Sequence, residues 1–587
     1  MADKTNMMYE YYRIPEGAVK SGTPVSIYLK IERRSAHNPS FCTENEHFPM
    51  KWVLFEKGFD IYKTVFTPET GLYFFKFKTD IFELDGGQIT VYDKSFTTPD
   101  WIYGGLIYHI MVDRFCRSGD TPVRDDAIFH ENKDDTPLFS PDENGIVKNN
   151  DFFGGNLKGI EDKLDYLSSF GVSAIYLSPV FKSFSNHKYD TGNYLEIDPM
   201  FGTEADLVSL CKEAKKHGIR IILDGVFSHT GDDSVYFNKY GNYDSVGAYQ
   251  SESSPYRSWY NIRSRNDYDC WWGISTLPTV NKNEPTYIEF IKNVLTHWQS
   301  KGVSSWRLDV ADELTDPMLD NIRIAAKGAD PESLIIGEVW EDASNKIAYG
   351  KRRHYLLGGQ LDSVMNYPLR SAIINFVKFG DAGGLKACIE TIMTNYPPPV
   401  INCLMNIIGT HDTERILTVL GSDKTFNSKT EMAEFSLSEE EYSLAVRRLK
   451  LASFLQMFLP GVPSIYYGDE AGMQGLIDPF NRRFYPWGKE NKEILSHYRK
   501  LSEFRKKTPL FKDGLYKTEY AANSIFIFKR YDETGSLTLA ANASSSPYLL
   551  FTRIYDMLND EHTDTINLYG FVIYGEDKNE QEGFKIT

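Results

Sequence analysis

The stretch Thr203-Glu-Ala-Asp-Leu-Val-Ser-Leu-Cys-Lys-Glu-Ala-Lys-Lys-His-Gly218-Ile-Arg-Ile-Ile-Leu-Asp224 contains one complete helix-to-strand unit. Thr203, with Asp206 three residues later, has the pattern of a helix N-terminal capping box, and Gly218 stands where a helix commonly ends. The apolar run after Gly218 predicts a buried strand that ends at Asp224. A helix followed by a buried strand is the repeating unit of an α/β fold.

The same alternation continues on both sides of this unit. Eight strand-like apolar runs, mostly separated by helical segments, predict a (β/α)8 TIM barrel over residues 99–508, which is longer than a typical barrel and requires insertions. The eight predicted strands begin at Ile107, Ala174, Ile219, Val303, Leu334, Leu361, Cys403 and Pro463.

Three further regions complete the predicted organisation. Residues 225–285 are rich in Tyr, Asn, Ser and Asp and lack a long periodic segment, which indicates a subdomain inserted between the third and fourth strands. Residues 1–98 contain period-two alternation such as Val25-Ser-Ile-Tyr-Leu-Lys-Ile-Glu32, and similar short strands return in residues 509–587. We therefore expect an α/β barrel flanked by an N-terminal and a C-terminal β-sandwich domain.

The charge and the cysteines exclude several classes of protein. Lys and Arg number 64 against 81 Asp and Glu, and a net charge of −17 disfavours nucleic acid or an anionic membrane as a partner. The six cysteines form no pair with metal-ligand spacing. No signal peptide or membrane-spanning stretch is recognisable, so a cytoplasmic location is expected, although a secreted protein whose leader had been removed would have the same sequence.

Carboxylates fall at the ends of the predicted barrel strands. Asp224 ends the third strand, Asp309 the fourth and Glu338 the fifth, and Asp412 follows the seventh. Because the strands are parallel, all these ends lie on the face of the barrel where active sites form. Arg307 stands two residues before Asp309, so its side chain points to the same side of the strand.

Such a cluster is suited to cleavage of a glycosidic bond. One ionised carboxylate attacks the anomeric carbon, a second carboxyl group protonates the leaving oxygen, and negative charge stabilises the oxocarbenium-like transition state. A single Asp at a strand end is more often a helix cap or an ion-pair partner, but four such positions on one rim favour a site. Arg307 would keep Asp309 ionised, and His229 and His411 flank the cluster as hydrogen-bond donors.

Seven segments resemble one enzyme family, the α-amylase family or glycoside hydrolase family 13. Its four characteristic regions resemble Asp224-Gly-Val-Phe-Ser-His229, Trp306-Arg-Leu-Asp-Val-Ala311, Gly337-Glu-Val-Trp340 and Gly409-Thr-His-Asp412. The neopullulanase, cyclomaltodextrinase and maltogenic amylase branch of the family resembles this chain at Asn186-His-Lys-Tyr-Asp-Thr-Gly-Asn-Tyr194, Leu277-Pro-Thr-Val-Asn281 and Gly461-Val-Pro-Ser-Ile-Tyr-Tyr-Gly-Asp-Glu470.

The resemblance implies a role for each matching residue. It implies that Asp309 is the nucleophile, that Glu338 is the general acid/base, and that Asp412 completes the catalytic set by binding the 2- and 3-hydroxyls of the reacting glucose. Asp224 would support the floor of the cleft. The implied substrate-binding residues are Tyr189, Asp190, His229, Trp272, Arg307, Glu313, Trp340 and His411.

The activity implied is retaining hydrolysis of α-1,4- and, as an extension, α-1,6-glucosidic bonds. Cyclodextrins, pullulan, maltooligosaccharides and starch are the candidate substrates, with transglycosylation as a side reaction. An α-1,6-glucosidase or a glucan transglycosylase of the same fold remains an alternative, and an inactive glucan-binding protein is a remote one, because all three catalytic carboxylates are present. The branch also implies a homodimer.

The chemistry requires no cofactor, but the branch often binds a structural calcium ion near the first barrel strand. Ser118-Gly-Asp120 and Gly154-Gly-Asn156 stand in the place of its ligand motifs. Oxygen ligands of this kind suit calcium. The residues that would form such a site are Asp120, Asp125, Asp126, Gly154 and Asn156.

Overall fold

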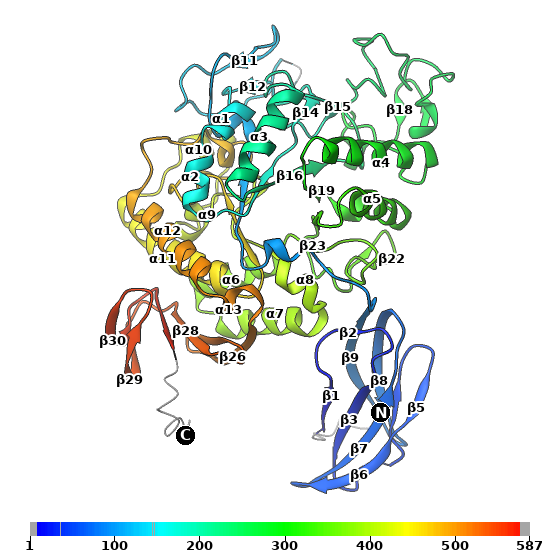
Figure 1. The fold of residues 1–587 in the computed structure, drawn as a ribbon, viewed down its shortest axis with the longest axis vertical. Helices are drawn as coiled ribbons and strands as arrows, with labels where there is room; N and C mark the ends of the chain where they lie inside the picture. The colour runs from blue at the N-terminus through cyan, green and yellow to red at the C-terminus, as the bar shows by residue number, and fades with distance from the viewer. Residues whose placement is uncertain (1–8, 36, 144, 146, 576–587) are drawn as a thin grey trace. The chain divides into compact units, whose positions relative to one another are not determined.

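A computed structural model describes residues 9–35, 37–143, 145 and 147–575. The chain divides into two compact units, which are described separately (Figure 1). The first unit contains residues 1–98, 342–362 and 389–401, and the second contains residues 99–341, 363–388 and 402–587.

The second unit is built on a parallel sheet of eight strands, in the order β23-β20-β19-β16-β13-β10-β25-β24. A parallel bridge between Met365 and Met405 joins the two ends of this sheet, which nearly closes it into a barrel. The bounds of each strand lie within two residues of those of a predicted apolar run, so the predicted (β/α)8 barrel is confirmed. The strands are β10 (Ile107–Ile110), β13 (Ala174–Leu177), β16 (Arg220–Gly225), β19 (Ser305–Leu308), β20 (Ile335–Gly337), β23 (Ser363–Val364), β24 (Met405–Ile407) and β25 (Val462–Tyr466).

The helix that precedes β16 begins and ends as the sequence predicts. Helix α3 (Glu204–Lys216) has a complete capping box, in which Thr203 and Asp206 each accept a hydrogen bond from the other's backbone N–H. Gly218 follows with a φ of 72°, a conformation that glycine adopts without strain. Long helices that follow other strands are α4 (Pro285–Ser300), α5 (Asp316–Ala329), α6 (Tyr367–Phe379), α11 (Glu439–Phe458) and α12 (Lys492–Lys507).

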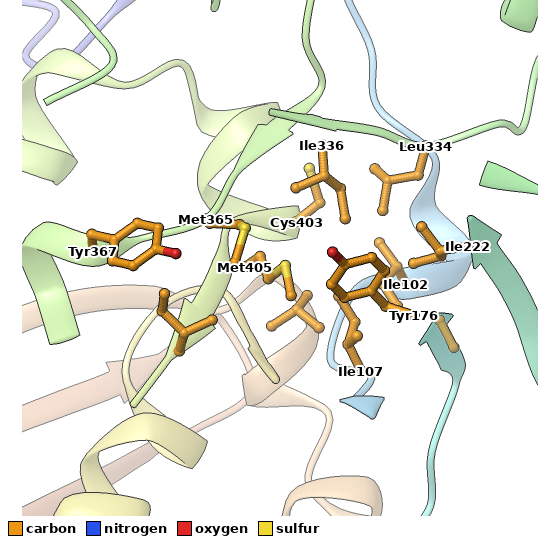
Figure 2. Close-up of a cluster of buried hydrophobic side chains, with 13 residues drawn as sticks. Ile102, Ile107, Tyr176, Ile222, Leu334, Ile336, Met365, Tyr367, Cys403 and Met405 are labelled. Atoms are coloured by element: carbon orange, nitrogen blue, oxygen red, sulfur yellow. The ribbon is translucent and has the colours of Figure 1, made fainter. Parts of the chain in front are cut away.

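Side chains from the barrel strands fill the interior of the barrel (Figure 2). Ile107, Tyr176, Ile222, Ile336 and Met405 come from five different strands and are fully buried in one cluster. The barrel is therefore a packed core and not a pore, so a substrate can meet the strands only at their ends.

The first unit contains two sheets that are antiparallel apart from one parallel strand pair, which confirms the predicted N-terminal sandwich. Alternate residues of β3 point into the core between the sheets, where they meet Phe77 and Ile89 of the other sheet. One sheet has the order β1 (Tyr9–Ile14), β3 (Val25–Glu32), β7 (Phe59–Phe66), β6 (Lys51–Glu56). The other has the order β2 (Val19–Lys20), β9 (Glu83–Tyr92), β8 (Gly71–Lys78), β4 (Ser40–Cys42), β5 (His47–Pro49).

The C-terminal segment also forms antiparallel strands around an apolar cluster. Ala540, Ile566 and Val572 form the buried centre of this cluster. Its sheets are β26 (Leu515–Ala522), β27 (Ile525–Tyr531), β28 (Ser536–Asn542) and β31 (Gly570–Gly575), and the pair β29 (Tyr548–Asp556) and β30 (Glu561–Ile566).

The segment between β16 and α4 contains little regular structure. Its only paired strands among the described residues are β17 (Ile262–Ser264) and β18 (Asp267–Tyr268). A bridge between His229 and Thr279 holds the two ends of the segment together beside the barrel strands. Over the described ranges, no helix has the length and apolar character needed to cross a membrane.

Candidate active site

Three carboxylates converge on one arginine at the carboxyl ends of β16, β19 and β20. Asp224 lies directly beside Arg307 in the β16–β19 ladder, and Asp309 and Glu338 directly follow β19 and β20. Arg307 is fully buried. Its Nη1 donates to both oxygens of Asp224 (2.9 and 3.0 Å) and to Asp309 Oδ1 (3.0 Å). Its Nη2 donates to Glu338 Oε2 (2.7 Å), so one guanidinium connects all three carboxylates.

Both oxygens of Glu338 are held in place. The backbone N–H of Val310 donates to Oε2 (2.9 Å), and the indole Nε1 of Trp340 donates to Oε1 (2.9 Å). Val310 has a φ of 35°, a strained value for a β-branched residue. Trp340 stacks on Tyr367 at 4.0 Å and remains 47% exposed. The Oε1 side of Glu338 is therefore the side next to the exposed indole.

Asp412 is held by a different arginine. Arg482 Nη2 lies 3.5 Å from Asp412 Oδ1, and His411 Nε2 lies 3.1 Å from Oδ2. Arg482 also donates to the carbonyl of His411 (3.0 Å) and pairs with Asp478 (2.9 Å). These contacts fix the loop after β24 against the loop after β25.

Tyr189 and two histidines form the aromatic part of the site. The Tyr189 hydroxyl donates to Asp224 Oδ2 (2.9 Å) and contacts His411, on which the tyrosine ring also stacks. His229 Nε2 contacts the carbonyl of Tyr189 (3.1 Å), and its Nδ1 contacts Ser228 Oγ (2.9 Å). Burial lowers the pKa of His229 to about 3 and the pKa of His411 well below its usual value, so both rings are neutral near pH 7.

The other predicted binding residues lie in two places. Trp272 donates from Nε1 to Glu313 Oε1 (3.0 Å), stacks on Trp271 at 4.6 Å and is 71% exposed. Trp272 thus presents an exposed indole beside the Glu313 carboxylate, whose side chain is only 10% exposed. Asp190 instead accepts hydrogen bonds from the backbone and the hydroxyl of Ser185, which hold its own loop.

Three aspartates of the site, Asp224, Asp309 and Asp412, bind protons more tightly than isolated carboxyl groups do. Burial raises the pKa of Asp309 well above its ordinary value, Arg307 opposes this shift, and Glu338 adds to it. Burial likewise raises the pKa of Asp224 and of Asp412. The two guanidinium groups therefore reduce the repulsion among the carboxylates without abolishing it.

The sequence reasoning missed several residues of the site. Tyr176 Oη donates to Asp224 Oδ2 (2.6 Å) from inside β13, and its position in the middle of an apolar strand provided no signal. Tyr367, under Trp340, is the first residue of helix α6, and a tyrosine at that position likewise provided no signal. Arg482 and Asp478 lie in the loop after β25, so the rule that strand ends converge could have identified them.

The two segments predicted to bind calcium lie side by side, because Asn156 donates to the carbonyl of Ser118 (2.7 Å), but their carboxylates do not gather there. Asp120, Asp125 and Asp126 are exposed, and Asn156 uses its side-chain oxygen to cap helix α1 (Leu157–Glu161). Within the described ranges, no group of three or more His, Cys, Asp or Glu side chains could hold a metal ion.

Backbone carbonyls of the same loop already accept hydrogen bonds from side chains of the protein. Arg117 donates from Nε (3.1 Å) and Nη2 (2.7 Å) to the carbonyl of Phe153, and from Nη2 to that of His130 (2.8 Å). Thr121 donates to the carbonyl of Gly154 (3.3 Å). Carbonyl oxygens are typical calcium ligands, and here a guanidinium provides the positive charge. These residues therefore do not fit a calcium ion.

Known proteins of similar sequence share this barrel. The family model described as alpha amylase, catalytic domain, matches residues 109–510. The amylopullulanase of Thermoanaerobacterium saccharolyticum is 40% identical over 493 residues, which cover 76% of this chain and 37% of that protein. This chain spans only 26% to 37% of the length of the three amylopullulanases that it matches.

Two further proteins resemble nearly the whole chain. The cyclomaltodextrinase of Geobacillus thermopakistaniensis is 31% identical over 556 residues, covering 89% of this chain and 83% of that protein. The solved structure of the type III pullulan hydrolase from Thermococcus kodakarensis has a TM-score of 0.70 at 26% identity and covers 95% of this chain and 98% of its own. Together with the barrel and the carboxylates at its strand ends, these matches show that the chain belongs to the α-amylase family of glycosidases.

Proposed function

We propose that this chain is a retaining glycosidase that cleaves α-glucosidic bonds at the Arg307 cluster. The observation that carries the proposal is that two adjacent nitrogens of one buried guanidinium hold Asp309 and Glu338. A retaining glycosidase needs its two carboxyl groups close together, because one attacks the anomeric carbon while the other protonates the leaving oxygen of the same bond.

The geometry divides the work between the two carboxyl groups. Asp309 Oδ would form a bond to the anomeric carbon as the glycosidic C–O bond breaks, and Glu338 would give its proton to the departing oxygen. Glu338 Oε2 is enclosed by Arg307 and Val310, so Oε1, beside the exposed Trp340, is the oxygen suited to deliver that proton. Glu338 would then take a proton from water, which displaces Asp309 and restores the original anomeric configuration.

Aromatic and polar groups around the cluster would position the sugar. Tyr189 offers a ring face for the reacting glucose, and Asp412, paired with Arg482, offers carboxylate oxygens to two neighbouring hydroxyls. The exposed rings of Trp340 and Trp272 would support glucose units further along the chain. Rings that already stack on a neighbour keep their orientation when a sugar binds, which lowers the entropic cost of binding.

The proposed substrates are α-1,4- and α-1,6-linked glucans, with cyclodextrins and pullulan as test compounds. The support for this choice is the likeness to proteins named amylopullulanase, cyclomaltodextrinase and pullulan hydrolase. The net charge of −17 agrees with a neutral polysaccharide as substrate.

The test is product analysis with β-cyclodextrin, pullulan and soluble starch, by chromatography and by NMR of the anomeric protons at early times. Maltose or panose released as the α anomer is the expected result. Release of the β anomer would overturn the retaining mechanism. Cleavage of α-1,6 bonds alone would identify an α-1,6-glucosidase, longer glucans would identify a transglycosylase, and stoichiometric binding without turnover would identify a glucan-binding protein.

A further inference from the structure

Asp412 lies further from its barrel strand than the other two catalytic candidates do. Asp309 and Glu338 directly follow β19 and β20, so the ladder hydrogen bonds of those strands fix their positions. Strand β24 ends at Ile407, five residues before Asp412, and the next helix is α9 (Ile416–Gly421). The position of the Asp412 carboxylate therefore depends on contacts with other parts of the chain.

One buried amide group holds the backbone on both sides of Asp412. Asn481 Nδ2 donates to the carbonyl of His411 (2.7 Å) and to the carbonyl of Thr413 (2.9 Å). Asn481 is 0% exposed and lies in the loop after β25, in the short 3-10 helix η6 (Phe480–Arg482). Both donors of this amide are thus used on the two residues that flank Asp412.

The contacts of Asn481 show why an amide is needed at this position. Its Oδ1 is buried and accepts no hydrogen bond from any of the described residues. If the amide were turned over, Oδ1 would face two carbonyl oxygens, which repel it. A buried acceptor without a donor is costly, so the position uses asparagine for its two N–H groups and not for its oxygen.

A buried arginine fixes the backbone of Asn481. Arg415 donates from Nε to the carbonyl of Asn481 (2.8 Å) and from Nη1 to Asp469 Oδ1 (3.0 Å). Its guanidinium also lies over the ring of Tyr466 in β25, 4.2 Å from the ring centre. The amide of Asn481 is therefore held at its own backbone, so it can in turn hold the Asp412 loop.

We propose that Asn481 is a positioning residue: by holding the carbonyls on both sides of Asp412, it sets the direction in which that carboxylate points to the reacting glucose. This inference rests on the proposed function, in which Asp412 binds two hydroxyls of that glucose. Of the direct contacts to the carboxylate, the one from Arg482 spans 3.5 Å, and the other comes from His411, whose own carbonyl Asn481 holds.

A displaced Asp412 should affect the chemical step more than the binding of substrate. Hydrogen bonds to the hydroxyls of the reacting sugar strengthen in the transition state. An interaction made mainly in the transition state contributes to kcat, whereas one made equally in the ground state contributes to KM. Loss of the Asn481 amide should therefore lower kcat and leave KM nearly unchanged.

The first test measures kcat and KM on β-cyclodextrin for Asn481→Leu, which keeps a similar volume and removes both donors. We expect kcat to fall about 10- to 100-fold, because a displacement of about 1 Å in an active site costs up to this much. The matched control is Asn542→Leu in β28, a buried amide that donates to three backbone carbonyls of the C-terminal segment. The control should lose stability and keep the wild-type kcat.

A double-mutant cycle tests whether Asn481 acts through Asp412. The substrate is α-maltosyl fluoride, because its good leaving group keeps slow variants measurable. Asp412→Ala alone should lower kcat strongly. Adding Asn481→Leu to Asp412→Ala should lower kcat by less than about twofold more, since residues that act through one another are not additive.

The outcomes separate the positioning role from the proposed function. If Asn481→Leu does not fold, Asn481→Ser keeps one donor, and the same cycle should show a smaller loss. Wild-type kcat in the Asn481 variants, beside an impaired Asp412→Ala, would overturn the positioning role and leave the proposed function standing. Losses that multiply in the double variant would show that Asn481 supports the fold and not Asp412. Wild-type kcat in Asp412→Ala would show that the role assigned to Asp412 is wrong, and the positioning role with it.

Discussion

Several carboxylates lie both at the mouth of the barrel, meaning the carboxyl ends of β16, β19 and β20, and in the loop between β10 and α1. Only those at the mouth are brought together around one buried arginine. Asp224, Asp309 and Glu338 are at most 5% exposed and share one guanidinium, whereas Asp120 and Asp125 lie separately in solvent. The carboxylates of the mouth follow strands whose ladder hydrogen bonds fix their spacing. Residues of a long loop have no such constraint, so their order in the sequence does not predict proximity.

The two regions also use an arginine in different ways. Arg307 is surrounded by carboxylates, and Arg117 by backbone carbonyls. A guanidinium among carboxylates compensates charges that the chemistry needs, while a guanidinium among carbonyls closes a loop. Substitutions should therefore separate the two regions, because one set affects catalysis and the other only stability.

The largest difference in kcat is expected between the variants Asp309→Asn and Asp120→Asn. The first removes the proposed nucleophile and should lower kcat on β-cyclodextrin by on the order of 10⁴-fold or more. The second changes an exposed loop carboxylate and should leave kcat unchanged. Initial rates measured side by side decide the matter, and turnover that survives Asp309→Asn would place the nucleophile elsewhere.

Replacing the buried arginine of the mouth should have the next largest effect, here on the free energy of unfolding. Arg307→Met leaves three buried carboxylates without their shared cation, and breaking such a cluster costs about 3–5 kcal/mol of unfolding free energy. Urea denaturation measures this loss. If the methionine variant does not fold, Arg307→Lys retains the charge and should fold with a reduced kcat. If both variants kept the wild-type stability and kcat, the guanidinium would be dispensable.

Removing the arginine of the loop should cost less. Arg117→Met leaves the carbonyls of Phe153 and His130 without their donors, at a cost of about 1–3 kcal/mol. Activity per folded molecule should stay near that of the wild type, since the substitution is outside the carboxylate cluster. A loss of kcat without a loss of stability would contradict this division of roles.

A smaller effect concerns the dependence of stability on pH. Burial raises the pKa of Asp309, so the folded protein binds that proton more tightly than the unfolded chain. The wild type therefore loses stability as pH rises from the ordinary Asp range, about 4, through the raised pKa, and Asp309→Asn lacks the contribution of Asp309 to this loss. The Tm of the variant should exceed that of the wild type by a margin that grows with pH. Calorimetry over a pH series would refute this if the margin were constant or shrank.

The smallest expected effect is that of a chelator. The loop residues do not fit a calcium ion, so EDTA should change neither the Tm nor kcat, and added calcium should not stabilise Arg117→Met. A calorimetric shift of several degrees on adding EDTA would show that a metal ion contributes to stability despite the guanidinium.

The positions of the strands and of the catalytic candidates could be predicted from the sequence because their signals are local. Apolar runs predicted all eight barrel strands to within two residues, and the strand-end rule identified Asp224, Asp309, Glu338 and Asp412. The partners of these groups could not be predicted, because they depend on which side chains meet across the barrel. Tyr176 appeared only as one more apolar strand residue, yet it donates a hydrogen bond to Asp224.

The sequence by itself determined the fold class, the family and the residues on the carboxyl rim, since periodicity and strand ends are read along the chain. The tertiary structure decided which carboxylates share the guanidinium of Arg307 and which loop is closed by Arg117. The physical reason is that hydrogen bonds, burial and strand order depend on distances between segments far apart in the sequence.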